Sequence, residues 1–202
     1  MHKYLASFFF VLSVGVAGQS SAQEAAKNAA PFGLTWGMSA AEVRALGAEL
    51  SEAKESDFGV SYTATKLPKV LTDVETVLLS FGYNDELWRV VVVSRDFSND
   101  PYGGALRQRY DELSRVLAEK YGRGTQFHRD DPNPYMGADD FLMAVHMGRA
   151  WHYTDYETDG LRVQLGVGAS SGSDGYWKLI FEDKALRKGF KQGKTAHEKE
   201  AL

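Results

Sequence analysis

Three side chains, His146, His152 and Asp155, have the types and spacing that could form a metal site. They lie in stretches predicted to be neighbouring strands, and two imidazoles with one carboxylate make an open zinc site of the kind that catalyses hydrolysis. The spacing matches no established zinc motif, and the two imidazoles could face opposite sides of their strands. We therefore interpret both histidines as ordinary strand residues with polar partners, and we predict neither a metal ion nor a cofactor.

An acidic, proline-interrupted loop is predicted over residues 128–140. It has oxygen-bearing side chains of the kind that calcium uses, namely Asp130, Asp131, Asn133, Asp139 and Asp140. Their spacing is not that of an EF-hand, which favours a solvated loop. The alternative is a partner-recognition loop, in which Tyr135 and Met136 are apolar anchors surrounded by charge.

Aromatic residues are frequent, and most of them are expected in the core because each ring buries a large area. Trp151 and Tyr153 alternate in a predicted strand and could instead stand on an exposed sheet face, where they would bind a peptide, a sugar or a protein. Together with the acidic loop they give the predicted partner-binding residues, Asp130, Asp131, Tyr135, Met136, Asp139, Asp140, Trp151 and Tyr153.

Other catalytic patterns are weaker. Ser170, Ser171 and Ser173 lie in a Gly/Ser-rich stretch that lacks the strand-to-helix setting of a nucleophile elbow, so we interpret it as a hairpin loop. Carboxylate pairs that could support hydrolysis are present by residue type only, at Asp155 with Glu157 and at Glu182 with Asp183. We predict no catalytic residues.

A short helix is predicted over residues 40–46, because Ser39 and Glu42 have the spacing of a capping box and Gly47 suits a left-handed stop. A long amphipathic helix is predicted from Asp100-Pro101 to Gly122. The strands are expected at 58–66, 74–83 and 87–95 before this helix, and at 141–147, 149–156, 160–168 and 175–182 after it.

This order of elements predicts an α+β fold, an antiparallel sheet with one short and one long helix packed on one face. Each helix is followed by a meander of strands, as in a degenerate duplication of an α-β-β-β unit. The other face of the sheet is then partly open, and there we expect a ligand or a partner.

The amino-terminal 22 residues have the features of a signal peptide. Lys3 precedes an apolar run of about 14 residues and a small-residue cleavage site, and the run is too short to cross a bilayer as a helix. The alternative is an uncleaved anchor. We expect a flexible leader at 23–31, one α+β domain at 32–187 and a charged, disordered tail at 188–202.

The composition limits the cellular compartments and the classes of partner that we expect for this protein. The chain has 202 residues, no cysteine and a formal net charge of −4, which argues against nucleic acid and anionic lipid as generic partners. Without cysteine, neither a disulfide nor lipidation of a lipobox is open to it. These features predict an exported, periplasmic protein without a transmembrane segment in its mature form, with secretion as the alternative.

The stretch from Phe32 to Val43, which includes Gly37-Met38-Ser39 and Glu42, resembles the helix-opening motif of small exported envelope proteins. These are the SmpA/OmlA lipoproteins and proteins with the β-lactamase-inhibitor-like fold. The resemblance implies a non-catalytic module that works through protein contacts at the cell envelope. The chain departs from the lipoproteins because it lacks the lipidation cysteine.

We therefore predict a periplasmic binding or accessory module that contacts another envelope protein. One variant of this hypothesis is an inhibitor that blocks an exported enzyme with the 128–140 loop. The alternatives are an envelope hydrolase that uses His146, His152 or nearby carboxylates, and a small-molecule carrier with an apolar pocket between helix and sheet.

Overall fold

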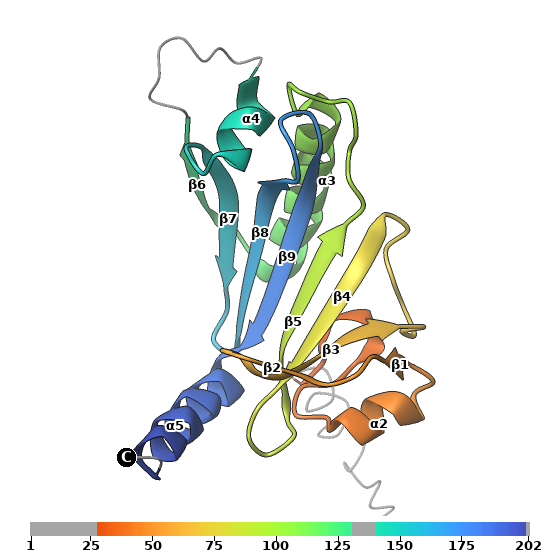
Figure 1. The fold of residues 1–202 in the computed structure, drawn as a ribbon, viewed down its shortest axis with the longest axis vertical. Helices are drawn as coiled ribbons and strands as arrows, with labels where there is room; N and C mark the ends of the chain where they lie inside the picture. The colour runs from red at the N-terminus through yellow and green to blue at the C-terminus, as the bar shows by residue number, and fades with distance from the viewer. Residues whose placement is uncertain (1–27, 131–139, 201–202) are drawn as a thin grey trace, which may run out of the picture.

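The computed structural model describes residues 28–130 and 140–200, and these residues build one antiparallel sheet with helices (Figure 1). The sheet has nine strands in the order β1-β3-β4-β5-β9-β8-β7-β6, and β2 also pairs with β3. The strands are β1 Glu49–Leu50, β2 Lys54–Ser56, β3 Gly59–Thr65, β4 Val74–Phe81, β5 Leu87–Ser94, β6 Thr125–Arg129, β7 Trp151–Glu157, β8 Leu161–Ala169 and β9 Gly175–Asp183.

The two halves of the chain have the same plan. In the first half, helix α2 (Ala40–Ala45) precedes the meander β3-β4-β5, and in the second, helix α3 (Gly104–Tyr121) precedes the meander β7-β8-β9. The third strands of the two meanders, β5 and β9, pair antiparallel at the middle of the sheet. The other helical elements are η1 (Pro31–Gly33), α4 (Phe141–His146) and α5 (Lys184–Glu200).

The core lies on one face of this sheet, under α2 and α3. Alternate strand residues point into it, and Leu79, Val90 and Leu165 have no exposed surface. Helix α3 contributes the apolar stripe that the sequence predicts, Leu106, Tyr110, Leu113 and Leu117, all buried. Because α2 and α3 pack into one continuous core, the predicted α+β architecture with helices on one face is confirmed.

Helix α2 begins at the capping box that the sequence predicts. The Ser39 hydroxyl accepts a hydrogen bond from the Glu42 amide at 3.2 Å, and the Glu42 carboxylate accepts one from the Ser39 amide at 2.8 Å. Gly47 follows with a φ of 91°, a left-handed conformation that suits glycine. Both features depend on neighbours within a few residues, which is why the sequence alone was enough to locate them.

Helix α3 begins later than predicted. Pro101 lies in a turn, and the helix starts at Gly104, where the Asp100 carboxylate accepts hydrogen bonds from the amides of Gly104 and Ala105 at 2.8 and 2.9 Å. Asp100 therefore caps the helix from four residues upstream. Gly122 ends it with a φ of 85°, as predicted.

Residues 141–147, predicted as a strand, form helix α4 and a following turn. The buried residues are Phe141, Leu142 and Ala144, a pattern that follows one side of a helical turn and not strand alternation. The Ala144 carbonyl accepts hydrogen bonds from the amides of Arg149 and Ala150, which turns the chain into β7. A run of consecutive apolar residues suits a buried strand and a buried helix equally, so the sequence did not separate them.

In the carboxy-terminal segment, residues 188–200, for which a disordered tail was predicted, continue helix α5. Phe190 anchors this helix, with its ring stacked on Trp88 at 4.9 Å and on Tyr83 at 5.6 Å between ring centroids. Figure 1 shows α5 extending beyond one end of the sheet. A single buried aromatic residue in a charged stretch is a weak signal for a packed helix, so the sequence did not predict α5. No helix among the described residues is long and apolar enough to span a membrane.

Candidate partner-binding site

Strands β6 and β7 lie at one edge of the sheet (Figure 1). Two of the predicted partner-binding residues, Trp151 and Tyr153, belong to β7. The two strands pair antiparallel, with Phe127 opposite Tyr153 and Arg129 opposite Trp151. All five residues of β6 are exposed. Because side chains alternate along a strand, these four residues share one face of the sheet, the face opposite α3.

On this open face the four side chains form what we term the aromatic platform, Phe127, Arg129, Trp151 and Tyr153. The rings of Phe127 and Tyr153 are stacked at 5.0 Å with an interplanar angle of 19°. The Arg129 guanidinium lies 4.8 Å from the centroid of the Trp151 ring. Phe127 and Trp151 are each 40% exposed, so the platform presents apolar area next to a positive charge.

A polar rim borders the platform along β7 and β8. Asp155 accepts hydrogen bonds from Gln164 at 2.8 Å and from the Arg162 guanidinium at 3.1 Å. Arg162 also lies 3.6 Å from Glu182, which Arg89 binds at 3.1 Å. The carboxylates Asp155 and Glu182 therefore have arginine partners on the sheet surface, an arrangement that supports charge pairing more than proton transfer.

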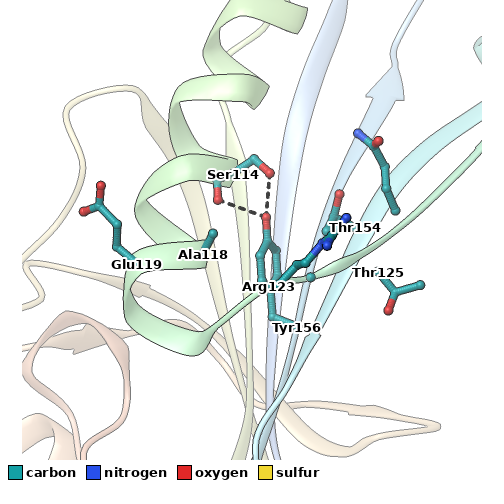
Figure 2. A pocket seen from close by; sticks show the side chains of 9 residues that line it. Ser114, Ala118, Glu119, Arg123, Thr125, Thr154 and Tyr156 are labelled. Atoms are coloured by element: carbon teal, nitrogen blue, oxygen red, sulfur yellow. Dashed lines mark hydrogen bonds between the residues drawn. The ribbon is translucent and has the colours of Figure 1, made fainter.

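A groove of about 850 Å³ lies on the other face of the same two strands, beside α3 (Figure 2). Tyr156 forms its floor, and its hydroxyl contacts the Ser114 hydroxyl at 2.6 Å and donates to the Ser114 carbonyl at 3.1 Å. The remaining lining residues are Ala118, Glu119, Arg123, Gly124, Thr125, Gln126 and Thr154. The groove is open and mostly polar, unlike the enclosed apolar pocket that a small-molecule carrier needs.

The histidines do not form the metal site considered from the sequence. His152 lies opposite His128, with 6.4 Å between ring centroids, and packs edge-on against Tyr110 at 4.6 Å. His146 lies on α4 with its Nδ1 3.4 Å from the Ala169 carbonyl, and Asp155 points to the other face of β7. Residues 28–130 and 140–200 contain no group of three metal-ligating side chains.

The surroundings of His152 lower its pKa and so favour the neutral imidazole. Burial is the largest cause that lowers its pKa from the usual 6.5, and the nearby Arg107 guanidinium acts in the same direction. Burial likewise raises the pKa of Tyr110 to about 12, and its hydroxyl pairs with that of Thr154 at 2.5 Å. These shifts follow from packing between α3 and the strands.

The predicted binding residues fall into three groups. Trp151 and Tyr153 belong to the platform, and Asp130 directly follows Arg129 at the end of β6. Asp140 lies immediately before helix α4. The other four, Asp131, Tyr135, Met136 and Asp139, lie outside the described residues.

Two platform residues, Phe127 and Arg129, were missed because no strand was predicted over residues 125–129 and Arg129 was assigned to the 128–140 loop. In the structure β6 extends to Arg129, into the stretch that was predicted as a loop. Polar and apolar residues alternate around Phe127 in Thr125–Arg129, and this pattern could have indicated a strand. The signal is weak because all five residues are exposed, so the strand has no buried face.

The serine-rich stretch is the hairpin loop between β8 and β9, as predicted. The Ser171 hydroxyl donates to the Asp174 carboxylate, and the Asn99 amide donates to the same carboxylate at 3.1 Å. These bonds tie the loop to the segment before α3. Of the second carboxylate pair, Asp183 accepts a hydrogen bond from the Leu186 amide at 2.8 Å near the start of α5.

Comparison with protein-family models, with curated proteins and with solved structures finds no match to this chain.

Proposed function

We propose that this protein is a non-catalytic binding module that contacts another protein of the cell envelope through the aromatic platform and the adjoining 128–140 segment. The observation that carries the proposal is the exposed arrangement of Trp151, Arg129, Phe127 and Tyr153 on the open face of β6 and β7. Exposed apolar area bordered by charge is typical of interaction surfaces.

The residue types support a protein partner. Tryptophan, tyrosine and arginine contribute disproportionately to binding energy at protein interfaces, because each combines a large contact area with a polar or charged group. The rim formed by Asp155, Arg162 and Gln164 supplies hydrogen-bonding groups around the apolar centre.

A sugar is a poorer fit. A sugar stacks on free aromatic ring faces, and here Phe127 and Tyr153 each use one face in their mutual stack while Arg129 covers one face of Trp151, so less ring area is left for a sugar. The ring edges and the guanidinium remain accessible, and such groups suit the side chains and backbone of a protein.

The cellular setting rests on the amino-acid sequence. Residues 1–22 have the charge and apolar pattern of an export signal, and the helix-opening motif at 32–43 resembles that of SmpA/OmlA-type envelope proteins. Together they support a periplasmic module, in which the partner is another exported protein.

Affinity capture from envelope extract tests the proposal. The parent protein is compared with Trp151→Ala and with the matched variant Val116→Ala, which removes an exposed apolar side chain from α3 instead. We expect a protein that is captured by the parent and by Val116→Ala, and at least tenfold less by Trp151→Ala. Equal capture by all three would show that the platform is not the binding surface.

A second variant, Tyr135→Ala/Met136→Ala, separates the segment from the platform. If the segment contributes apolar anchors, this variant weakens capture of the same protein while circular dichroism stays unchanged. Unchanged capture would restrict the binding surface to the platform.

A further inference from the structure

Strand β6 is an edge that the described residues leave unprotected. It pairs with β7 on one side only, and its register with β7 runs from Thr125 to Arg129 without interruption by a bulge. The strand contains no proline, and its five side chains are all exposed. The opposite end of the sheet ends in strands of two and three residues, β1 and β2, which are too short to act as a template.

The aromatic stack on this edge is incomplete. Phe127 uses one ring face to stack on Tyr153, which lies inward on β7. Its other ring face is therefore directed past the edge of the sheet, and the side chain is 40% exposed. A strand added beside β6 would place a side chain against this free face, because residues directly opposite each other are close neighbours.

We propose that β6 pairs antiparallel with β6 of a second copy of this chain, around a two-fold axis normal to the sheet at Phe127. An interface of this symmetry is self-complementary, so the residue on the axis meets itself. The stack then continues without a break from Tyr153 through both Phe127 rings to Tyr153 of the second copy. The two sheets join into one.

The charges along β6 select this register. An axis at Phe127 places Thr125 opposite Arg129 and Gln126 opposite His128 of the other copy, so no like charges lie opposite each other. An axis one residue earlier, at Gln126, places Arg123 opposite Arg129, which is repulsive. An axis at His128 places Phe127 opposite Arg129 and breaks the ring stack.

The helix side of the edge has room for the second strand. Helix α3 packs on β7, β8 and β9, and the groove of about 850 Å³ separates it from Gln126 on β6. In the dimer both α3 helices lie on one face and both platforms on the other. The two Trp151 side chains then belong to one continuous surface, twice the size of that on a single chain.

Sedimentation velocity over a wide range of protein concentration tests the dimer. We expect a concentration-dependent monomer–dimer equilibrium for the parent protein. The variant Phe127→Lys brings two positive charges together at the axis and should raise the dissociation constant of the dimer at least tenfold. The matched variant Val116→Lys adds the same charge on α3 and should behave as the parent. A parent that is monomeric throughout, or a dimer that survives Phe127→Lys, overturns the proposal.

The absence of cysteine from the sequence allows a direct test of register. Thr125→Cys and Arg129→Cys chains are mixed in equal amounts and oxidised gently. Because Thr125 faces Arg129 of the other copy, the mixed disulfide dimer should exceed either same-variant dimer several-fold. A mixed dimer in only the twofold excess that random pairing gives, or no disulfide dimer at all, would rule out the Phe127-centred pairing. This result is independent of envelope-partner capture, so the dimer and the proposed function can fail separately.

Discussion

The indole nitrogen of Trp177, on the buried face of β9, donates a hydrogen bond at 3.0 Å to the carboxylate of Asp73 in the loop before β4. Arg109 of α3 binds the same carboxylate through two nitrogens, at 2.8 and 3.1 Å. Asp73 thus links the two halves of the chain, since β4 belongs to the first meander and α3 and β9 to the second.

Replacement of Asp73 should destabilise the fold. Asp73→Ala leaves the buried Trp177 indole without its acceptor and removes the two hydrogen bonds that Arg109 makes to Asp73, and we expect a loss of about 2–3 kcal/mol in the free energy of unfolding. Urea denaturation followed by circular dichroism measures it. Glu75→Ala, at an exposed position nearby, is the matched control and should change the stability by less than about 0.5 kcal/mol. Equal effects of the two substitutions would contradict this role of Asp73.

Stability should fall when the pH drops below about 6.5, in part because of His152. The unfolded chain takes up a proton at this residue near pH 6.5, whereas the folded protein does so only at lower pH because burial lowers the pKa of His152. The unfolded state therefore binds more protons between the two values, and stability decreases as the pH falls through that window.

The measurement is the free energy of unfolding at a series of pH values for the parent, His152→Gln and His146→Gln. We expect a shallower slope below about pH 6.5 for His152→Gln than for the parent, because the glutamine side chain binds no proton in either state. A slope unchanged by His152→Gln would show that other groups cause the pH dependence.

Gly124 should not tolerate a larger side chain, although it lies near the surface. A Cβ atom at this position would lie 2.5 Å from Cγ2 of Thr154 and 2.7 Å from the ring of Tyr156. Gly124→Ala should therefore displace the start of β6 from these β7 side chains and cost about 1–3 kcal/mol. Gly160→Ala is the control, since its Cβ would meet no atom within 4 Å. The midpoint of thermal unfolding distinguishes the two variants. Equal midpoints would mean that the neighbouring side chains move aside at no cost in stability.

Helix α5 should depend on a single side chain for its attachment. Phe190 is 8% exposed and lies between Trp88 and Tyr83, so Phe190→Ala removes the main apolar contact of α5. Hydrogen exchange should become faster over residues 184–200 and stay unchanged in β8 and β9. Lys191→Ala, on an exposed position of the same helix, should change neither. Faster exchange throughout the sheet would show that α5 is part of the cooperative core.

Local signals in the sequence predicted the elements that depend on near neighbours. The capping box at Ser39 and Glu42, the stop at Gly47 and the stripe of α3 are formed by residues within a few turns of each other. The strands of both meanders were predicted because their alternation reflects one buried face.

The features missed from the sequence depend on distant contacts. Helix α4 places Leu142 beside Gly175, and α5 places Phe190 against Trp88, and both contacts join residues far apart in the sequence. For the candidate site, Trp151 and Tyr153 were identified by residue type and alternation. Their partners Phe127 and Arg129 were not, since cross-strand register cannot be read along a single strand.

The pairing of β5 with β9 determines the order in which the molecule can fold. The bond between Arg89 and Glu182 closes a loop of 93 residues, and the chain entropy lost in that closure must be offset before the central ladder gains stability. The strands of the first meander pair with one another, but β5 has no neighbour on its far side until β9 pairs with it. We therefore expect a slow, late folding step.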